Sequence, residues 1–563
     1  MTPPNTDAGV PSAASTAPSA PLAVPSASDT PITTLPPRYN AAEDLLSRNL
    51  EAGRGDKIAY IDDTTSLTYA ELDARARRFA GALRDAGFRQ EERLLLCALD
   101  TIDFPTVFLG CLLAGVVPVA VNTLLTADDY AYMLGHSAAR AVVVSEPLLP
   151  VMKAAIDKSG LTPMVIQAAP HGESAPTCSV RAMLARTRSP AQTVRSGPDD
   201  MAFWLYSSGS TGKPKGTVHT HGNLFHTADL YARQVLGIRE DDVVFSAAKL
   251  FFAYGLGNAL TFPMSVGATT VLMAERPTPA AVFKRLREQR PTIFCGVPTL
   301  FAGMLAAPDL PPRAEVSLRL CTSAGEALPR DIGERFLAHF GCDILDGIGS
   351  TEMLHIFLSN RPGDVHYGTT GKPVPGYELK LLDEHGEPCA PGEIGDLYIK
   401  GPSAALMYWC NRDKTRDTFV GEWTRSGDKY QRDADGYYTY AGRSDDMLKV
   451  GGIYVSPFEV EAALAQHPAV LEAAVIGVAD ADELVKPKAF VVLRPGQQWH
   501  DGMAAELQAF IKSRLAPYKY PRQIECVAEL PKTATGKIQR FRLRQRENAA
   551  REVACEAGQR PAQ

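Results

Sequence analysis

Apolar stretches that suit strands alternate along the chain with longer stretches that suit helices. The most apolar run extends from Val107 to Val121. It is too short to span a membrane, and Gly115 and Pro118 interrupt it. The pattern therefore predicts a buried helix over Phe104–Ala114, a turn, and a buried strand over Val117–Val121.

The same alternation continues on both sides of this run. Thr68 and Glu71 have the spacing of a capping box, in which each side chain satisfies a backbone N–H at the start of a helix, and this helix is expected to reach about Ala86. The other predicted elements are strand Arg93–Leu99, helix Ala127–Ser137, strand Ala141–Val144, buried strand Met201–Leu205, helix His221–Leu236, strand Val243–Ala247, helix Pro279–Gln289 and strand Thr292–Gly296. This order predicts an α/β fold with parallel-rich sheets flanked by helices.

The pattern changes after Lys449. Ser456, Pro457 and Glu459 provide an N-cap, a proline at the first helical position and a capping-box glutamate. The elements expected from here on are helix Pro457–His467, strands Ala473–Val478 and Ala489–Leu493, and helix Met503–Leu515. We therefore predict a large N-terminal domain over residues 38–444, with a small β-rich subdomain, and a small α+β domain over residues 445–555.

Composition narrows the class of protein. A chain of 563 residues is too long for one hydrophobic core. Residues 1–37 are rich in Pro, Ala, Ser and Thr and lack the basic and apolar segments of a secretory signal, which predicts a disordered tail. The net charge of −6 gives no basic field for nucleic acid. The ten cysteines form no Cys-x-x-Cys or Cys/His metal pattern, which predicts reduced thiols in a cytoplasmic protein with no membrane segment.

The densest chemical signal is the stretch Tyr206–Gly216, Tyr-Ser-Ser-Gly-Ser-Thr-Gly-Lys-Pro-Lys-Gly, which follows the buried strand. Glycines let backbone N–H groups approach an anion, hydroxyls add donors, and Lys213 and Lys215 add positive charge. This composition predicts a phosphate-binding loop. The P-loop pattern of NTPases does not fit, because Pro214 stands where a Ser or Thr is needed, and Gly-x-Gly-x-x-Gly is absent.

Several later stretches contain candidate chemistry, although each is weak alone. They are Ser323–Leu328 after a strand Ser317–Cys321, Asp346–Glu352 after a strand Ile344–Leu345, Trp423–Asp428 before a hairpin at Asp435–Tyr440, Gly442–Lys449, and Pro531–Ile538 with its lone Lys537. In order and spacing, these stretches and the Gly-rich loop resemble the adenylate-forming superfamily of acyl- and aryl-CoA synthetases, luciferases and adenylation domains. The resemblance covers the chain apart from the N-terminal tail.

The resemblance implies a role for each stretch in the activation of a carboxylate by ATP. Ser207, Ser208, Gly209, Ser210, Thr211, Gly212 and Lys213 would cradle the β- and γ-phosphates. Thr351 would bond the α-phosphate, Glu352 would hold Mg²⁺, and Lys537 would bridge the carboxylate and the α-phosphate as the catalytic cation. Two stretches would enclose the adenine, one with Gly325, Glu326 and Ala327 and the other with Asp346, Gly347 and Ile348. The ribose would bind Asp428 and Arg443. Ile348 stands where the family usually has an aromatic residue, so aliphatic contact would replace stacking.

The same resemblance implies a second half-reaction with coenzyme A. Asp445 matches the hinge about which a mobile C-terminal domain swings, and the swing would bring Lys449, Gly451 and Gly452 to the pantetheine tunnel. Domain closure that rebuilds a site between steps is a known device. Lys537 is also a candidate for regulation by acetylation, which would remove its charge, and a homodimer is a candidate assembly.

The acyl pocket would be shaped by the Phe251–Gly257 loop and nearby residues. The pocket residues implied are Ala253, Tyr254, Gly325, Ile348, His355 and Ile356. The loop offers flat apolar walls without an arginine or extra carboxylate. Its amino-acid sequence resembles that of benzoate–CoA ligases, and this resemblance predicts benzoate or a small substituted benzoate. His355 would either pack against the ring of the acid or be a satisfied core histidine.

Four alternatives stay open at this point. They are a medium-chain fatty acyl-CoA ligase, a stand-alone adenylating enzyme that loads a carrier protein, a nucleotide sensor without catalysis, and a nucleic-acid-binding protein. The sensor is disfavoured because Lys537 and Glu352 are both present. The basic run Lys537–Arg546 could suggest RNA, but a solvated face or a site near a polyanionic cofactor is the preferred interpretation.

Overall fold

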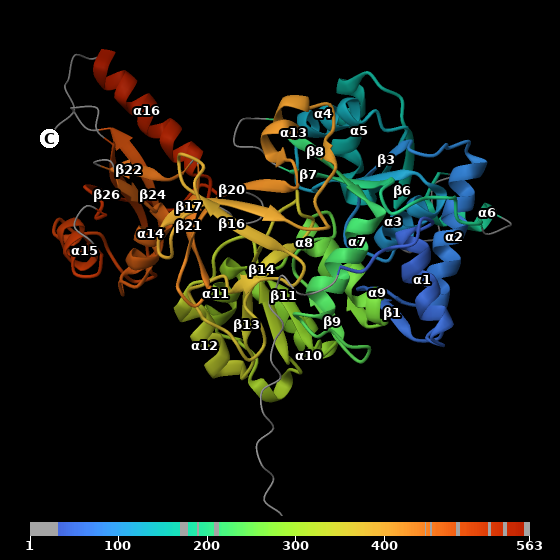
Figure 1. The fold of residues 1–563 in the computed structure, drawn as a ribbon, viewed down its shortest axis with the longest axis horizontal. Helices are drawn as coiled ribbons and strands as arrows, with labels where there is room; N and C mark the ends of the chain where they lie inside the picture. The colour runs from blue at the N-terminus through green and yellow to red at the C-terminus, as the bar shows by residue number, and fades with distance from the viewer. Residues whose placement is uncertain are drawn as a thin grey trace, which may run out of the picture.

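The computed structural model describes residues 32–168, 178–187, 191–207, 213–444, 446–450, 453–479, 485–515, 519–532 and 538–556. Figure 1 shows a large body that contains the N-terminal and central parts of the chain, and a smaller C-terminal lobe, coloured red, at one side of it. Among the described residues, no helix combines the length and the apolar character that crossing a membrane requires.

The first large sheet has seven strands in the order β18-β8-β7-β4-β3-β5-β6. The pairs β7–β4, β4–β3, β3–β5 and β5–β6 are parallel, whereas β7–β8 and β8–β18 are antiparallel. The strands are β3 (Arg93–Cys97), β4 (Val117–Ala120), β5 (Ala141–Ser145), β6 (Met164–Ala168), β7 (Met201–Ser207), β8 (Lys215–Thr220) and β18 (Met407–Tyr408). The helices in this part of the chain are α2 (Tyr69–Asp85), α3 (Asp103–Ala114), α4 (Ala127–Ser137), η1 (Glu146–Leu148), α5 (Leu149–Ser159) and α6 (Val180–Arg186).

The second large sheet has nine strands in the order β15-β14-β13-β12-β11-β9-β10-β1-β2. Its central pairs, from β13 to β1, are parallel, and the pairs at both edges are antiparallel. The strands are β1 (Ile58–Ile61), β2 (Ser66–Thr68), β9 (Val243–Ser246), β10 (Thr269–Val271), β11 (Ile293–Gly296), β12 (Leu320–Ser323), β13 (Ile344–Gly349), β14 (Ile356–Ser359) and β15 (Lys372–Pro373). The helices are α1 (Ala41–Glu51), α7 (His221–Thr227), η2 (Ala228–Arg233), α8 (Ala253–Leu256), η3 (Gly257–Thr261), α9 (Phe262–Val266), α10 (Pro279–Glu288), α11 (Pro298–Ala306), η4 (Arg313–Glu315) and α12 (Arg330–Phe340).

Two further parts complete the fold. A five-stranded antiparallel sheet contains β16 (Glu378–Leu382), β17 (Ile394–Lys400), β19 (Phe419–Val420), β20 (Trp423–Arg432) and β21 (Tyr438–Arg443), and α13 (Arg412–Thr418) lies among them in sequence. The C-terminal lobe contains the pair β22 (Leu448–Val450) and β23 (Ile453–Val455), the sheet β24 (Val470–Ala479), β25 (Val485–Leu493) and β26 (Gln523–Cys526), and helices α14 (Pro457–Ala465), α15 (Met503–Lys512) and α16 (Arg540–Glu556). The α/β fold class with a small α+β lobe is confirmed; the boundary at residues 444 and 445 stays a prediction.

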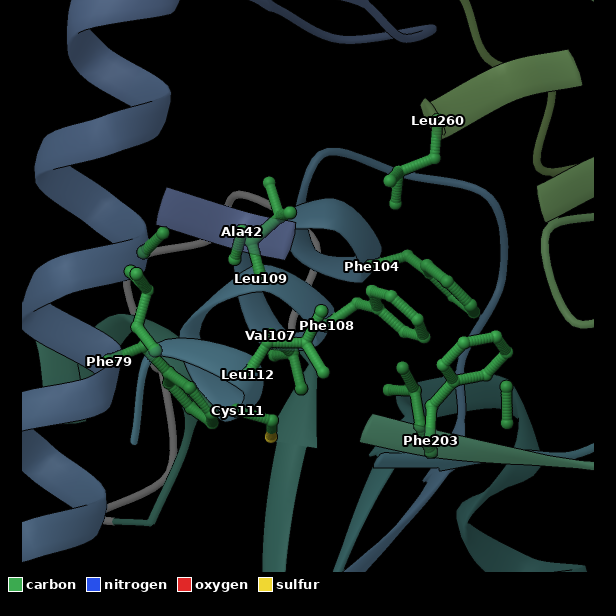
Figure 2. Packing of buried hydrophobic residues seen from close by; sticks show 14 of the residues in the cluster. Ala42, Phe79, Phe104, Val107, Phe108, Leu109, Cys111, Leu112, Phe203 and Leu260 are labelled. Atoms are coloured by element: carbon green, nitrogen blue, oxygen red, sulfur yellow. The ribbon is translucent and has the colours of Figure 1, made fainter. Parts of the chain in front are cut away.

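The apolar run around residue 110 forms a fully buried helix and strand, as the pattern predicts. Figure 2 shows α3 with Phe104 and Phe108 directed at Phe203 of β7, and the Phe108 and Phe203 rings lie 5.5 Å apart. Gly110 allows α3 to approach α2 closely, because a Cβ there would lie 2.8 Å from the carbonyl oxygen of Ala76. A larger side chain at this position would push the two helices apart.

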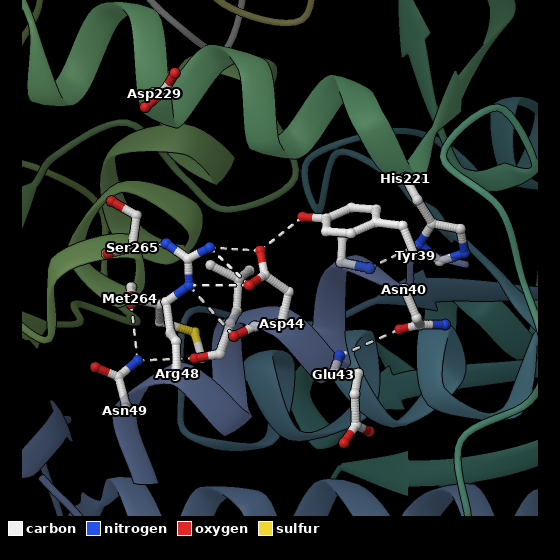
Figure 3. Close-up of polar contacts among 12 residues, drawn as sticks. Tyr39, Asn40, Glu43, Asp44, Arg48, Asn49, His221, Asp229, Met264 and Ser265 are labelled. Carbon is white, nitrogen blue, oxygen red and sulfur yellow. Dashed lines mark hydrogen bonds and ion pairs between the residues drawn. The ribbon is translucent and has the colours of Figure 1, made fainter. Parts of the chain in front are cut away.

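Helix α1 connects the start of the described chain to helices α7 and α9 (Figure 3). The side chain of Asn40 caps its first turn by accepting the backbone N–H of Glu43 at 3.2 Å, and His221 Nδ1 accepts the first N–H of the helix at 3.2 Å. At the other end, Asn49 Nδ2 donates to the Met264 carbonyl at 2.8 Å. These contacts hold α1 against α7 and α9, so the N-terminal segment belongs to the large body.

Some predicted elements differ from the structure at their bounds. The helix expected over His221–Leu236 changes from α7 into the wider π-type turn of η2. The strand expected at Ser317–Cys321 lies later, as β12, and β13 extends to Gly349 instead of ending at Leu345. The glycines of that stretch disfavour a strand by propensity, but pairing with β14 extends β13 through Asp346–Gly349, and only the residues from Ser350 onwards leave the strand.

In the C-terminal lobe, the predicted N-cap is confirmed, since the Ser456 side chain accepts the backbone N–H of Glu459 at 3.2 Å. The carboxylate of Glu459, however, accepts from Lys519 Nζ at 2.7 Å instead of closing the capping box. An ion pair with a distant lysine is a partner that local sequence spacing does not reveal. Helix α14 also ends at Ala465, before the predicted end at His467.

Candidate active site

The predicted phosphate loop connects two antiparallel strands of the first sheet. Ser207 at the end of β7 pairs with Lys215 at the start of β8, so the Gly-rich segment is the connection of a hairpin. Ser208, Gly209, Ser210, Thr211 and Gly212 lie outside the described residues. The strand that follows the loop distinguishes it from a P-loop, which leads into a helix.

Helix α4 supports the base of this loop. The hydroxyl of Tyr132 donates to the Pro214 carbonyl at 3.2 Å, and Lys213 Nζ lies 5.1 Å from the centre of the Tyr132 ring. One turn along the helix, His136 Nδ1 lies 2.8 Å from the hydroxyl of Tyr206. The loop is therefore anchored on both sides by side chains of one helix.

Residues from three distant segments meet beside the loop. Glu352 Oε1 accepts from the Tyr408 hydroxyl at 2.7 Å and from the Ser207 hydroxyl at 3.2 Å. Lys215 Nζ lies 3.9 Å from this carboxylate and 3.2 Å from the Tyr408 oxygen. Burial lowers the pKa of Lys215 despite the attraction of Glu352, and burial together with Glu352 raises the pKa of Tyr408. The cluster fixes one carboxylate next to the predicted position of the phosphates.

The Glu352 carboxylate suits a Mg²⁺ ion that a nucleotide brings with it. Mg²⁺ keeps several waters and usually takes one or two carboxylates together with phosphate oxygens, so it does not need an all-protein cage. No group of three or more His, Cys, Asp or Glu residues in the described ranges could form such a cage. The donor set next to the loop is thus compatible with a phosphate-bound Mg²⁺.

A buried histidine holds the backbone of Thr351. His219 Nε2 donates to the Thr351 carbonyl at 2.8 Å, and its Nδ1 accepts from Asn223 Nδ2 at 2.9 Å. Burial lowers the pKa of His219 to about 4, so the ring is neutral at pH 7 and both of its nitrogens are used. The sequence analysis missed His219, Asn223 and Tyr408, since no local pattern links them to the Thr351–Glu352 pair.

The two stretches predicted to enclose adenine lie side by side. Strands β12 and β13 are parallel neighbours with Ser323 opposite Asp346, so both stretches are placed at the carboxyl end of the second sheet. The first stretch continues through Gly325, Glu326 and Ala327, and the second through Gly347 and Ile348. Gly325 has a φ of +90°, which favours glycine, and no atom would lie within 4 Å of an added Cβ.

Asp346 is the unusual group of this part of the site. Its side chain is buried, and Oδ1 has no hydrogen-bond partner among the described residues. Burial raises the pKa of the carboxyl group well above its ordinary value. A buried polar atom without a partner is costly, so a donor from a ligand would be stabilised there.

The residues predicted to bind ribose face each other across two strands. Asp428 of β20 is opposite Arg443 of β21, and Arg443 Nη1 donates to Asp428 Oδ1 at 3.0 Å. The carboxylate is therefore already oriented by a cation. A diol could share this carboxylate as a second donor.

The predicted acyl-pocket residues gather around α8 and β14. The Tyr254 hydroxyl and Thr322 Oγ1 are 2.6 Å apart, which ties α8 to β12. His355 Nε2 donates to the Tyr254 carbonyl at 3.2 Å, and its ring lies 4.4 Å from that of Phe262. Ala253 and Tyr254 are partly exposed, whereas His355 and Ile356 are buried.

His355 falls between the two alternatives that the sequence left open. One nitrogen is bonded to the protein, while Nδ1 is buried without a partner among the described residues. Burial lowers its pKa to about 3, so the ring is neutral. Gly257 makes room for it, because a Cβ there would lie 2.4 Å from the imidazole.

The remaining predicted site residues belong to the last part of the chain. Asp445, Gly451, Gly452 and Lys537 lie outside the described residues, and Lys449 is described only as part of the β22 backbone. The roles predicted for these residues stay predictions.

The basic run after Lys537 has one exposed face and two arginines that are paired with acids. Arg540 forms hydrogen bonds to both carboxylate oxygens of Glu461, at 2.5 and 3.0 Å, and Arg544 donates to Asp446 at 2.6 Å. Arg542 and Arg546 are exposed, which agrees with the predicted solvated face, whereas Arg540 and Arg544 are partly buried in ion pairs. These two ion pairs attach α16 to its own lobe and to the segment that follows the predicted hinge.

Comparison with known proteins identifies the family. Family models described as AMP-binding enzyme and AMP-binding enzyme C-terminal domain match residues 47–409 and 459–537. The chain belongs to the AMP-binding enzyme family. The adenylate-forming resemblance read from the Gly-rich loop and the later stretches is thereby confirmed.

Individual members of the family are similar over nearly the whole chain. The benzoate–CoA ligase of Thauera aromatica is 63% identical over 91% of this chain and 97% of its own length. The 4-hydroxybenzoate–CoA/benzoate–CoA ligase of Rhodopseudomonas palustris is 51% identical over 90% and 94%.

Solved structures give the same result. A benzoate CoA ligase from Burkholderia xenovorans superposes with a TM-score of 0.84 at 62% identity, covering 90% of this chain and 100% of the other. An anthranilate CoA ligase in complex with anthranoyl-AMP superposes with a TM-score of 0.87 at 42% identity, covering 93% and 99%.

Proposed function

We propose that this protein is an acid–thiol ligase that converts benzoate, or a small substituted benzoate, to its CoA thioester. In the first half-reaction a carboxylate oxygen attacks the α-phosphorus of ATP, forming benzoyl-adenylate and releasing pyrophosphate. In the second, the thiol of coenzyme A attacks the acyl carbon and AMP leaves. The observation that carries the proposal is the 63% identity to the benzoate–CoA ligase of Thauera aromatica over 91% of the chain.

The geometry around the phosphate loop supports the first half-reaction. Transfer of this kind needs charge stabilisation and positioning more than a protein nucleophile. Ser207 and Lys213 stand at the two ends of the loop, and Glu352 is held beside it by Tyr408 and Lys215. We assign Glu352 to Mg²⁺, which would neutralise phosphate charge when bound. We assign Thr351 to the α-phosphate.

The remaining roles follow the family pattern. The β12 and β13 stretches would take the adenine, with Asp346 offering a buried acceptor, and Asp428 would take the ribose hydroxyls with Arg443. Lys537 would bridge the carboxylate and the α-phosphate. Asp445 would then act as the hinge for the exchange that brings Lys449, Gly451 and Gly452 to the pantetheine of coenzyme A.

The acyl pocket favours a short aromatic acid over a fatty acid. Next to Tyr254, the ring of His355 packs against Phe262 at 4.4 Å and Tyr231 at 5.4 Å. We infer that this cluster of buried rings limits the length of the acid, and the partly exposed Tyr254 offers a flat wall to an aryl ring.

We further propose a cytoplasmic enzyme that binds neither nucleic acid nor membrane, a homodimeric assembly, and regulation by acetylation of Lys537. Light scattering on a sizing column tests the dimer. Mass spectrometry of the protein purified from its own cells tests the modification, and a Lys537 that is never modified would refute it.

A substrate panel in a pyrophosphate-release assay tests the function. The acids are benzoate, 4-hydroxybenzoate, 2-aminobenzoate and octanoate, each with ATP, Mg²⁺ and coenzyme A. We expect the highest kcat/KM with benzoate. A higher value for octanoate would favour the fatty acyl alternative, and adenylate formation without transfer to coenzyme A would favour loading of a carrier protein.

A further inference from the structure

The loop that shapes the acyl pocket begins at a buried junction between the two large sheets. Leu250, just before the loop, donates its backbone N–H to both carboxylate oxygens of Asp100, at 3.2 and 3.3 Å. Asp100 lies just after β3 of the seven-stranded sheet, and its side chain is only 2% exposed. Leu250 itself follows β9 of the nine-stranded sheet.

The neighbouring residue attaches the same point to a second strand. Lys249 Nζ donates to the Glu275 carbonyl at 2.7 Å and to the Met273 carbonyl, both just after β10. Burial lowers the pKa of Lys249, and Asp100 opposes this by attracting the ammonium group. Burial raises the pKa of Asp100 to about 6, and Lys249 and the Leu250 N–H oppose that rise. The buried carboxylate of Asp100 and the partly exposed ammonium group of Lys249 therefore attract each other at the start of the loop.

The loop is folded tightly onto this start. Phe252 donates its N–H to the Lys249 carbonyl at 3.0 Å, and a Cβ on Gly255 would lie 2.0 Å from the same carbonyl oxygen. Ala253 and Tyr254 stand between these two contacts. A shift of Lys249 or Leu250 is therefore passed to both pocket residues, because the loop has no room to absorb it.

We propose that Asp100 is a positioning residue for the acid substrate, which fixes the acyl-pocket loop through the Leu250 N–H without touching the acid itself. The inference rests on the proposed function, because it assumes that Ala253 and Tyr254 line the acid pocket. Asp100, which follows a strand of the seven-stranded sheet, would therefore affect binding of the acid but not binding of ATP.

The test compares Asp100→Ala with Asp100→Asn in the pyrophosphate-release assay. The Asn side chain keeps an acceptor for the Leu250 N–H, whereas Ala removes it. We expect D100A to raise the KM for benzoate at least fivefold and to change the KM for ATP less than twofold. D100N should keep both KM values within twofold of the parent. If D100A does not fold, D100V, which also lacks an acceptor, replaces it with the same expectation.

The matched control is Asp242→Ala, at the opposite end of β9. Asp242 is also buried and accepts a backbone N–H, from Arg239 at 2.8 Å, but its ion pair with Arg319 is remote from the loop. D242A should lower the melting temperature and leave the KM for benzoate unchanged.

Different results would overturn the proposed function and the positioning role. A parent enzyme that releases no pyrophosphate with benzoate would refute the proposed function. An active parent whose D100A variant binds benzoate normally, or loses affinity for ATP and benzoate alike, would refute the positioning role, and so would a D100N variant no better than D100A.

Discussion

Tyr408→Phe removes a single hydroxyl from the cluster beside the phosphate loop. That hydroxyl donates to Glu352 Oε1 at 2.7 Å, and Glu352 is our proposed Mg²⁺ ligand. A hydrogen bond to a charged group contributes about 1.5–3 kcal/mol. Ser207 and Lys215 still hold the carboxylate in the variant, so we take the lower end, about 1.5 kcal/mol, which corresponds to roughly a tenfold change in affinity.

The assay is pyrophosphate release with ATP and Mg²⁺ varied together. We expect the KM for Mg·ATP to rise about tenfold and the KM for benzoate to stay within twofold, because the Phe ring preserves the packing of Tyr408.

Tyr367→Phe is the control, because Tyr367 donates to the carboxylate of Asp343 at 3.0 Å at the other end of β13. It removes the same kind of bond away from the site and should leave both KM values unchanged. If Y408F had the parent's KM for Mg·ATP, or if Y367F raised it equally, the assignment of Glu352 to the metal would lose its support.

Three further variants test other parts of the account. Lys537→Ala should abolish adenylate formation but leave thioester formation from synthetic benzoyl-adenylate largely intact; equal loss of both steps in a two-stage assay would contradict its role. Asp428→Ala should raise the KM for ATP about tenfold, since it removes a charged acceptor, with a smaller effect on the KM for benzoate; the reverse order would place the ribose elsewhere. His355 has a pKa of about 3 in the folded protein against an ordinary 6.5, so its stabilising contribution is complete above about pH 6.5 and is lost as the pH falls towards 3. We would measure the free energy of unfolding in urea at pH 7.5 and at pH 5.5. Between these two pH values, the His355→Phe variant should lose about 1 kcal/mol less of this free energy than the parent. Identical losses would show that this histidine is not held neutral.

Local chemistry made several elements predictable from the sequence. The capping box of Thr68 and Glu71 is present in both directions, at 3.2 and 2.8 Å, because its partners are three residues apart. The buried α3 and β4 were also readable, since their apolar run has no other stable environment in a folded protein.

Contacts between residues that are far apart in the chain could not be predicted from the sequence. Tyr408 contacts Glu352 because the two-residue strand β18 pairs with β8 at the edge of the seven-stranded sheet. The basic residues after Lys537 looked available for a polyanion, yet Arg540 is paired with Glu461, which lies in a helix far earlier in the chain. Neither contact leaves a spacing that a reader of the sequence could recognise.

The same limit applies to the acyl pocket. Its aromatic loop was recognisable by composition, but the anchoring of Leu250 by Asp100 joins two sheets and has no local signature. Partners of buried polar groups are therefore where the structure adds most to the sequence.

The most direct measurement of the central claim uses benzoate labelled with ¹⁸O in its carboxylate. Attack of the carboxylate on the α-phosphorus of ATP carries one carboxylate oxygen into AMP when coenzyme A displaces it. We predict that mass spectrometry will find one ¹⁸O atom in each AMP formed with benzoyl-CoA. Unlabelled AMP, or ADP and phosphate in its place, would contradict the account.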